Sequence, residues 1–134
     1  MTDEMATLPR LKVDHLVKHF PIVQGTMIKK QVGVNYAVDD ISFEVPRGAS
    51  LGIIGETGCG KTTLARTIGQ LDKATSGKVY FEGIDIVSLK EEGMRSIRPK
   101  IQLIFQESFG SYNPSMTMEK VFGELMVLHD VSQK

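Results

Sequence analysis

The sequence predicts an α/β fold, because a buried-strand pattern, a glycine-rich loop and a helical pattern follow one another directly. Residues 50–54 are nearly all apolar, which is typical of a strand buried on both faces of a parallel sheet. Residues 55–62 are rich in glycine. After them Leu64, Ile68 and Leu71 recur at the i, i+4 and i+7 positions of one helix face. The order strand, loop, helix therefore predicts a parallel core around this loop.

The loop, GETGCGKT at residues 55–62, fits the pattern G-x-x-x-x-G-K-[ST], which binds nucleotide phosphates. Its glycines lack a β-carbon, so the backbone can approach an anion closely. The amides of the loop and of the first helical turn can then converge on the α- and β-phosphates at the positive end of the helix. The residues predicted to bind the nucleotide here are Gly55, Glu56, Thr57, Gly58, Cys59, Gly60, Lys61, Thr62 and Thr63.

Three side chains of this loop have individual interpretations. Lys61 supplies a mobile ammonium for the β- and γ-phosphates, and Thr62 supplies a hydroxyl for Mg²⁺, which prefers oxygen ligands. The alternative, a glycine-rich turn with an accidental lysine, does not account for the flanking strand and helix patterns. Cys59 is either a reactive thiol at a helix N-terminus or a small residue whose backbone alone matters; we favour the second interpretation.

Composition excludes several other classes of protein. A length of 134 residues suits one domain or part of one. The 16 basic and 16 acidic residues cancel, so nothing global favours a nucleic-acid partner. No apolar run approaches the ~18 residues of a membrane span, and the N-terminus has no apolar stretch typical of a signal peptide. The single cysteine fits a reducing cytosol.

The segment before the loop reads as two strands. Residues 11–17 predict the first and residues 38–45 the second, with a turn at residues 46–48 leading into the phosphate-loop strand. Between them, residues 21–35 have no clear periodicity, which indicates a loop or a loose hairpin.

After the loop helix, a turn at residues 75–77 leads into a strand at 79–81, and residues 82–83 turn the chain again. Residues 91–97 predict a short helix that stops before Pro99.

The last third of the chain begins with a second buried-type strand at residues 101–105, followed by a polar stretch at 107–115. Thr117 is positioned to cap a final helix. One face of that helix carries Met118, Val121, Phe122 and Leu125.

Four segments carry a family resemblance: LVKHFPI at 16–22, YAVDDISFEVPRG at 36–48, the phosphate loop followed by TTLAR, and IQLIFQESFGSYNP at 101–114. Together they make the chain resemble the nucleotide-binding subunits of ABC transporters, and among them the ATPase subunits of oligopeptide and dipeptide importers. The resemblance covers nearly the whole chain. It implies the N-terminal part of an ABC ATPase, a P-loop NTPase fold with an antiparallel β subdomain at about 8–48 and 76–88. The P-loop core would lie at about 49–72 and 100–134.

The same resemblance implies roles for residues outside the loop. Phe20 lies where the family has an aromatic residue that stacks on adenine; the alternative is a core aromatic at a strand end. Gln106 would approach Mg²⁺ and the attacking water, so that Gln106 and Lys61 are the candidate catalytic residues and Thr62 and Gln106 the metal ligands; alone, Gln106 would read as a polar residue at a strand end. Residues 108–114 would contact a transmembrane permease subunit. A second nucleotide-binding subunit, ATP, Mg²⁺ and a location on the cytoplasmic face of the cell membrane follow from the same resemblance.

Several family motifs are absent from these 134 residues. There is no LSGGQ signature, no apolar run ending in Asp-Glu, and no switch histidine after such a run. Because phosphoryl transfer needs positioning and charge stabilisation together, we expect weak nucleotide binding and no meaningful hydrolysis by this chain alone. The resemblance also implies that the strands at 50–54 and 101–105 are not neighbours, which would leave open edges and a partner-dependent fragment.

Two other functional classes remain open at this point. A small kinase with the same loop would need an acceptor site and a lid, and residues 101–114 would then have no explanation. A non-catalytic nucleotide-binding or interaction module from a truncated or split gene would need neither.

Overall fold

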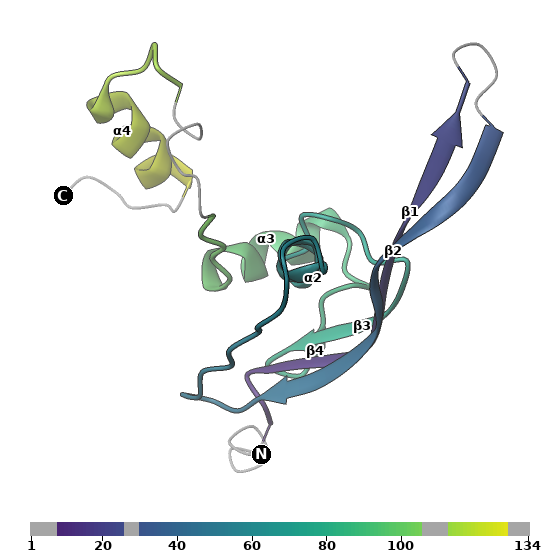
Figure 1. Cartoon of the computed structure of the whole chain (residues 1–134). Helices are drawn as coiled ribbons and strands as arrows, with labels where there is room; N and C mark the ends of the chain where they lie inside the picture. Colours follow the sequence, from purple (N-terminus) through teal and green to yellow (C-terminus); the bar gives the residue numbers. More distant parts are fainter. Residues whose placement is uncertain (1–7, 26–29, 106–112, 129–134) are drawn as a thin grey trace.

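The chain forms an antiparallel sheet, and the helices at residues 61–68 and 91–97 pack on one side of it (Figure 1). A computed structural model describes residues 8–25, 30–105 and 113–128. The four strands have the order β2-β1-β3-β4. They are β1 Leu11–Gln24, β2 Lys30–Val45, β3 Ser76–Phe81 and β4 Ile84–Asp85, each antiparallel to its neighbour. The expected antiparallel sheet in the N-terminal part is therefore confirmed.

The β1–β2 ribbon is longer than the sequence predicts. Pairing runs from Leu11 opposite Val45 to Gln24 opposite Lys30, so both strands extend into residues 21–35, where we expected a loop or a loose hairpin. The register shifts at several points along the pair, including between Lys18 and His19. Cross-strand hydrogen bonds hold this segment in strand conformation although its side chains show no clean alternation.

The tight turn between β3 and β4 is confirmed. Glu82 and Gly83 both have positive φ angles, 51° and 83°. Two consecutive positive φ angles are the mark of a type I′ hairpin turn, whose twist matches that of the strands it joins.

The helix after the phosphate loop is α2, Lys61–Ile68, and it ends earlier than the apolar pattern predicts. Gln70 adopts a left-handed φ of 57°, and the amides of Gln70 and Leu71 donate to the carbonyls of Thr67 and Arg66. This is the Schellman arrangement of a helix C-terminus. Leu71 therefore lies outside the helix and is 55% exposed, so its assignment to one helix face with Leu64 and Ile68 is wrong.

The two later helices agree with the sequence. Helix α3 spans Glu91–Ile97, and the 3-10 turn η1, Arg98–Lys100, follows it and contains the proline that we expected to end the helix. Helix α4 spans Met118–Leu128, and the Thr117 hydroxyl accepts a hydrogen bond from the Lys120 amide at 3.4 Å. The apolar face of α4 remains open to solvent, since Met118 and Phe122 are 58% and 55% exposed.

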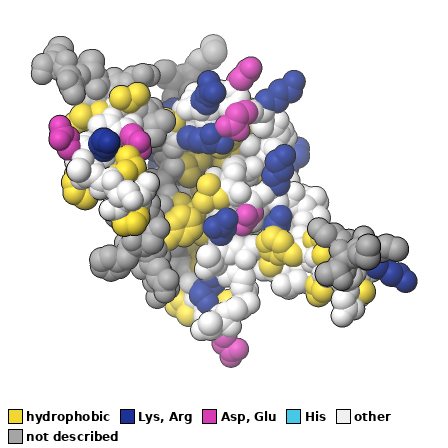
Figure 2. All heavy atoms as spheres, turned by 90° about the horizontal axis from the view of Figure 1, so that it is seen from above, with side chains coloured by type: hydrophobic (Ala, Val, Ile, Leu, Met, Phe, Trp, Pro, Cys, Tyr) yellow, Lys and Arg dark blue, Asp and Glu magenta, His cyan; other side chains and the backbone are white. Residues whose placement is uncertain are grey.

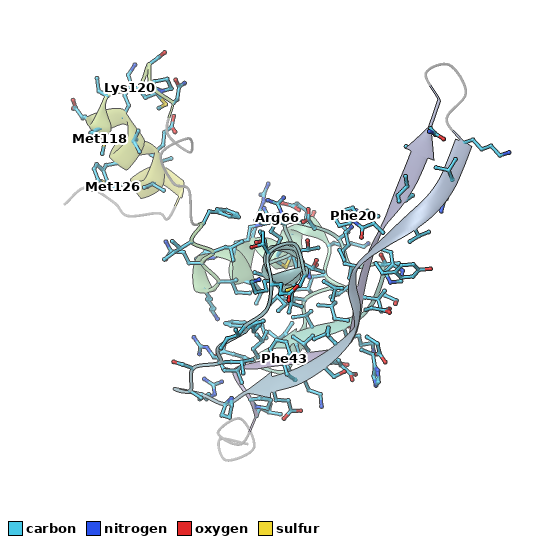
Figure 3. The ribbon with its side chains drawn as sticks, in the orientation of Figure 1. Phe20, Phe43, Arg66, Met118, Lys120 and Met126 are labelled. Carbon is cyan, nitrogen blue, oxygen red and sulfur yellow. The ribbon has the colours of Figure 1, made fainter. Side chains whose placement is uncertain are left out.

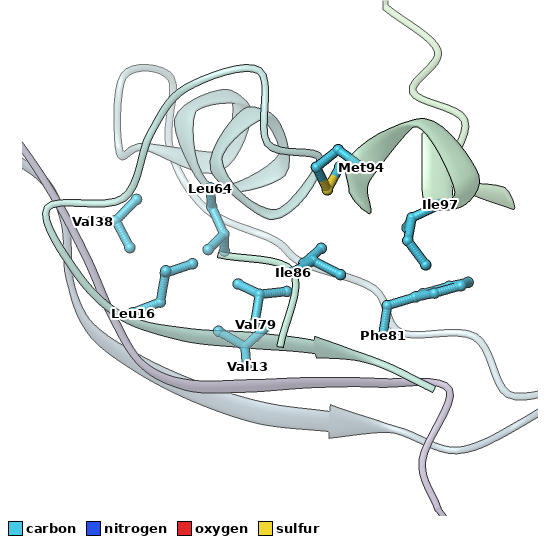
Figure 4. Packing of buried hydrophobic residues seen from close by; sticks show 9 residues of the cluster. All are labelled: Val13, Leu16, Val38, Leu64, Val79, Phe81, Ile86, Met94 and Ile97. Atoms are coloured by element: carbon cyan, nitrogen blue, oxygen red, sulfur yellow. The ribbon is translucent and has the colours of Figure 1, made fainter. Parts of the chain in front are cut away.

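A small core lies between the sheet and helices α2 and α3 (Figure 4). It is supplied by β1, β2, β3, both helices and the segment after β4. The buried apolar residues are Val13, Leu16, Val38, Leu64, Val79, Phe81, Ile86, Met94 and Ile97. Thr67 is buried among them and donates from its hydroxyl to the Thr63 carbonyl at 2.7 Å. This core fixes α2, and with it the phosphate loop, against the β1–β2 ribbon.

The two strands predicted at residues 50–54 and 101–105 are not formed, and this part of the prediction is wrong. Both segments lack a strand partner among the described residues, and Ile54 and Ile104 are 97% and 85% exposed. Hydrophobic side chains accordingly lie open on the surface between basic ones (Figure 2). An apolar run becomes a strand only where another backbone accepts its hydrogen bonds. Because neither segment forms a strand, the expectation that the two strands are not neighbours stays a prediction.

Candidate functional site

The glycine loop leads into α2 with the amides of the first helical turn available for a ligand. The first helical hydrogen bond runs from the Leu64 amide to the Gly60 carbonyl at 2.8 Å, and no side chain caps the helix. The amides of Lys61, Thr62 and Thr63 therefore have no acceptor within the helix. Amides in this position, together with the positive end of the helix dipole, favour an anion.

Close approach to backbone requires glycine at position 60 of the loop, whereas at position 55 a β-carbon would only displace a side chain. A β-carbon on Gly60, whose φ is 97°, would collide with the carbonyl oxygen of Ala37 on β2. A β-carbon on Gly55 would lie 2.6 Å from the Cys59 sulfur. The loop is thus packed against the ribbon on one side and against itself on the other.

Lys61 bridges the loop through its side chain. Its ammonium nitrogen donates to the carbonyls of Gly55 and Glu56, each at 2.7 Å, and lies 3.5 Å from the Cys59 sulfur. The loop carbonyls thus hold the Lys61 ammonium within the loop.

The ribbon and the loop together line one cavity of about 440 Å³. Residues 57–63 form one wall and β1 and β2 contribute the other, with Phe20, Asn35, Tyr36 and Ala37. Phe20 is 37% exposed and lies on the ribbon beside α2, the helix that carries Arg66 (Figure 3). The structure therefore brings Phe20 together with seven of the predicted loop residues, whereas Gly55 and Glu56 lie outside the cavity lining.

Three residues of the cavity wall, Asn35, Tyr36 and Ala37, were missed as site residues. They line the cavity because β2 pairs with β1 through residues 30–36 as well. The sequence of residues 21–35 shows no strand periodicity, so this pairing was not expected. One sequence feature bears on Ala37: the glycine at position 60 allows the Ala37 backbone to approach the loop closely.

Of the two residues predicted to bind Mg²⁺, Thr62 and Gln106, only Thr62 lies among the described residues. The Thr62 side chain is exposed at the start of α2, as a metal ligand there needs to be. Gln106 lies outside the described residues, and so do residues 108–112 of the predicted permease contact at 108–114. Within the described part of the chain, no group of three or more His, Cys, Asp or Glu side chains is arranged to hold a metal ion.

An ion pair fixes the end of α2 behind the loop. Arg66 donates from Nε to the Asp72 carboxylate at 2.7 Å, and this hydrogen bond holds the pKa of Asp72 below its usual value. Arg66 also lies 6.0 Å from the centre of the Phe105 ring. These contacts hold the Arg66 guanidinium at the C-terminal end of α2.

None of the helices in the described residues has the length and apolar character needed to span a bilayer.

Comparison with known proteins identifies relatives along most of the chain. Residues 38–133 match the family model described as ABC transporter. The oligopeptide transport ATP-binding protein AppF of Bacillus subtilis (strain 168) is 42% identical over 122 residues, which are 90% of this chain and 37% of that protein. The dipeptide transport ATP-binding protein DppF of Escherichia coli (strain K12) is 33% identical over 131 residues, 96% of this chain and 39% of that protein. The chain thus spans about a third of the length of these curated relatives.

Solved structures agree at the level of the fold. A dimeric ATP-binding cassette, MJ0796, in a post-hydrolysis state bound to ADP and Pi, matches with a TM-score of 0.62 at 25% identity, over 82% of this chain and 51% of that one. A second dimeric structure of the same cassette gives a TM-score of 0.57 at 23% identity, over the same shares of the two chains, and supports the fold alone.

Proposed function

The chain belongs to the ABC transporter family, and we propose that it forms the ATP-binding part of an ATPase subunit that energises oligopeptide or dipeptide import. One observation carries this proposal: Phe20 and residues 57–63 of the phosphate loop line the same cavity. An aromatic ring and an anion-binding helix N-terminus at one cavity suit the base and the phosphates of a nucleotide.

The proposal assigns a role to each predicted site residue. Phe20 stacks on adenine, while the loop amides from Glu56 to Thr63 and the Lys61 ammonium bind the phosphates. The exposed Thr62 hydroxyl is an oxygen ligand of the type that Mg²⁺ prefers. Mg²⁺ would neutralise phosphate charge when bound, and the family resemblance implies that Gln106 would approach it and the attacking water.

The proposed organisation has two parts and two protein partners. Residues 8–48 and 76–88 form the β subdomain, and residues 49–72 and 100–134 belong to the P-loop core. Residues of about 108–114 contact a permease subunit, and a second nucleotide-binding subunit completes the site. These partners place the chain on the cytoplasmic face of the cell membrane.

The 134 residues alone are expected to bind nucleotide weakly and to hydrolyse it negligibly. Phosphoryl transfer needs a positioned water and stabilisation of the developing charge as well as a phosphate cradle. The described residues supply the cradle, and the sequence contains neither the LSGGQ signature nor an apolar run ending in Asp-Glu.

A second candidate function is a non-catalytic module that binds nucleotide or another polypeptide. The observation that favours it is an apolar groove of about 350 Å³, lined by β1, β2 and α2 and by the unpaired segments that include Leu51, Ile53, Ile101 and Leu103. Large exposed apolar surfaces on soluble proteins commonly mark a contact with another chain.

Calorimetric titration of the 134-residue chain with MgATP, alongside a phosphate-release assay, tests the leading proposal. We expect measurable ATP binding. Lys61→Ala should lower the affinity for ATP at least about tenfold, because the ammonium that contacts the phosphates is removed. Lys78→Ala, which removes an exposed lysine of β3, serves as the control and should bind as the wild type does.

Two results would contradict the proposal. ATP binding that survives Lys61→Ala unchanged would remove the phosphate loop from the site. Turnover by this chain at the ~1–10³ s⁻¹ typical of enzymes would overturn the expected lack of hydrolysis.

A further inference from the structure

Asn35 lies directly beside Phe20 on the cavity wall. The two residues are cross-strand partners in the antiparallel β1–β2 pair, so their side chains project from the same face of the ribbon. Both line the cavity of about 440 Å³ that also contains the phosphate loop. A flat group stacked on the Phe20 ring therefore has its edge next to the Asn35 carboxamide.

The neighbouring side chains leave this position to Asn35. Lys18 places its ammonium 4.6 Å from the centre of the Phe20 ring and donates to the Lys73 carbonyl at 2.8 Å, and it is not part of the cavity lining. Tyr36 pairs with His19, and its ring meets the His19 ring edge-on with centroids 4.4 Å apart. Tyr36 therefore lines the cavity as well, but its ring is engaged by His19.

The Asn35 carboxamide is available to hydrogen-bond a ligand, since it is exposed and forms no hydrogen bond with any described residue. A carboxamide presents one donor and one acceptor side by side. Adenine offers the matching pair, an N7 acceptor and an N6 amino donor, whereas guanine offers two acceptors, N7 and O6, on the same edge.

We propose that Asn35 hydrogen-bonds the edge of the base stacked on Phe20 and thereby favours adenine over guanine nucleotides. The inference rests on the proposed nucleotide-binding function and adds a specificity-determining residue to it. Stacking on Phe20 is tolerant of base identity, because every base has a π-face. The choice between bases therefore depends on a side chain at the base edge.

The experiment compares ATP, GTP and tripolyphosphate binding by the 134-residue chain with that of Asn35→Leu, measured by titration calorimetry. The wild type should prefer ATP to GTP. Asn35→Leu keeps the size of the side chain but removes the amide, and should lower the affinity for ATP about fivefold or more, the lower end of what a bidentate base contact contributes. The affinity for GTP should change little and that for tripolyphosphate not at all.

Two further variants control for changes in folding. Gln31→Leu makes the same kind of replacement on β2 outside the cavity and should leave all three affinities unchanged. Asn35→Thr places a strand-favouring residue at the same position. It should reproduce the fall in the ATP-to-GTP ratio even if Asn35→Leu proves unstable.

The possible failures are distinguishable. If the wild-type chain binds neither ATP nor tripolyphosphate, the nucleotide-binding function fails and the inference fails with it. If ATP binds but is not preferred to GTP, or if Asn35→Leu and Asn35→Thr leave the ratio unchanged, the inference is overturned and the proposed function stands. An equal loss for ATP and GTP would assign Asn35 to the ribose instead and would likewise overturn it.

Discussion

Gly60 and Ala37 are packed so closely that a β-carbon on Gly60 would collide with the Ala37 carbonyl oxygen. Ala37 lies on β2 where the β1–β2 register shifts, next to the pair formed by His19 and Tyr36. This irregular point of the ribbon is therefore where the sheet meets the phosphate loop. The contact sets the separation between Phe20 and the loop, and with it the width of the cavity.

Gly60→Ala should destabilise the chain strongly and abolish nucleotide binding. The left-handed φ of 97° costs a non-glycine residue about 1–2 kcal/mol, and forcing a methyl group into a packed contact costs about 1–3 kcal/mol more. We expect a loss of about 2–5 kcal/mol in the free energy of unfolding, measured by urea denaturation.

Gly58→Ala is the matched control for this substitution. Gly58 has a similar φ of 84°, but a β-carbon there meets nothing within 4 Å, so only the backbone strain of about 1–2 kcal/mol applies. If the two variants lost equal free energy of unfolding, the contact with Ala37 would make no separate contribution to stability.

The phosphate loop could be recognised in the sequence because its chemistry is local. The glycines, Lys61 and Thr62 lie within one short segment, and α3 and the turn at Glu82 and Gly83 depend in the same way on nearby residues. Where residues far apart in the sequence meet, prediction was incomplete. The pairing of Phe20 with Asn35 links two strands through a segment without periodicity, and only the assembled ribbon reveals it.

The failed strands at residues 50–54 and 101–105 illustrate the opposite limit. Ile54 and Ile104 have the residue type of a buried strand, yet they are almost fully exposed. An apolar run indicates that a segment can be buried. Strand formation also requires a neighbouring backbone that accepts its hydrogen bonds. The sequence of a segment does not contain that neighbour.

Phe20→Ala should weaken nucleotide binding through the base alone. Stacking of a base on an aromatic side chain contributes about 1–3 kcal/mol, so we expect ATP affinity to fall at least about fivefold while tripolyphosphate affinity is retained. Ile22→Ala, two residues along the same face of β1 and outside the cavity, should have no effect on ATP. Unchanged ATP and GTP binding in Phe20→Ala would exclude the stacking role.

Asp72→Asn should lower stability at neutral pH but not in strong acid. Arg66 holds the pKa of Asp72 below its usual value through a hydrogen bond, so the charged pair stabilises the fold above the unfolded pKa of about 3.9. That contribution is lost as the pH falls through the lower pKa of the folded state. Urea denaturation at pH 7 and at successively lower pH should show the difference between variant and wild type closing.

The Arg66→Gln background provides the control for this pair. If the pair acts as described, Asp72→Asn has little further effect at pH 7 once the guanidinium is gone. An undiminished effect in that background would assign the loss to another contact of Asp72.

Asp40→Asn should lower the pKa of His15. Asp40 accepts a hydrogen bond from His15 Nδ1 at 2.6 Å, and this bond, together with the negative charges of Asp40 and Asp14, raises the pKa of His15 above its ordinary value of 6.5. Asparagine tolerates the left-handed φ of 52° at this position, so the substitution changes the charge with little backbone strain. An NMR titration of the imidazole in wild type and variant measures the shift.

The sign of the linked stability follows from the direction of that shift. A raised pKa means that the protonated His15 stabilises the fold fully below about pH 6.5, provided Asp40 is ionised, and that this contribution is lost as the pH rises through the folded pKa. Asp40→Asn should therefore cost more stability near pH 6 than near pH 9. Glu92→Gln, which removes an exposed charge on α3, should leave the His15 titration unchanged. A His15 pKa that does not fall in Asp40→Asn would show that the pair does not persist in solution.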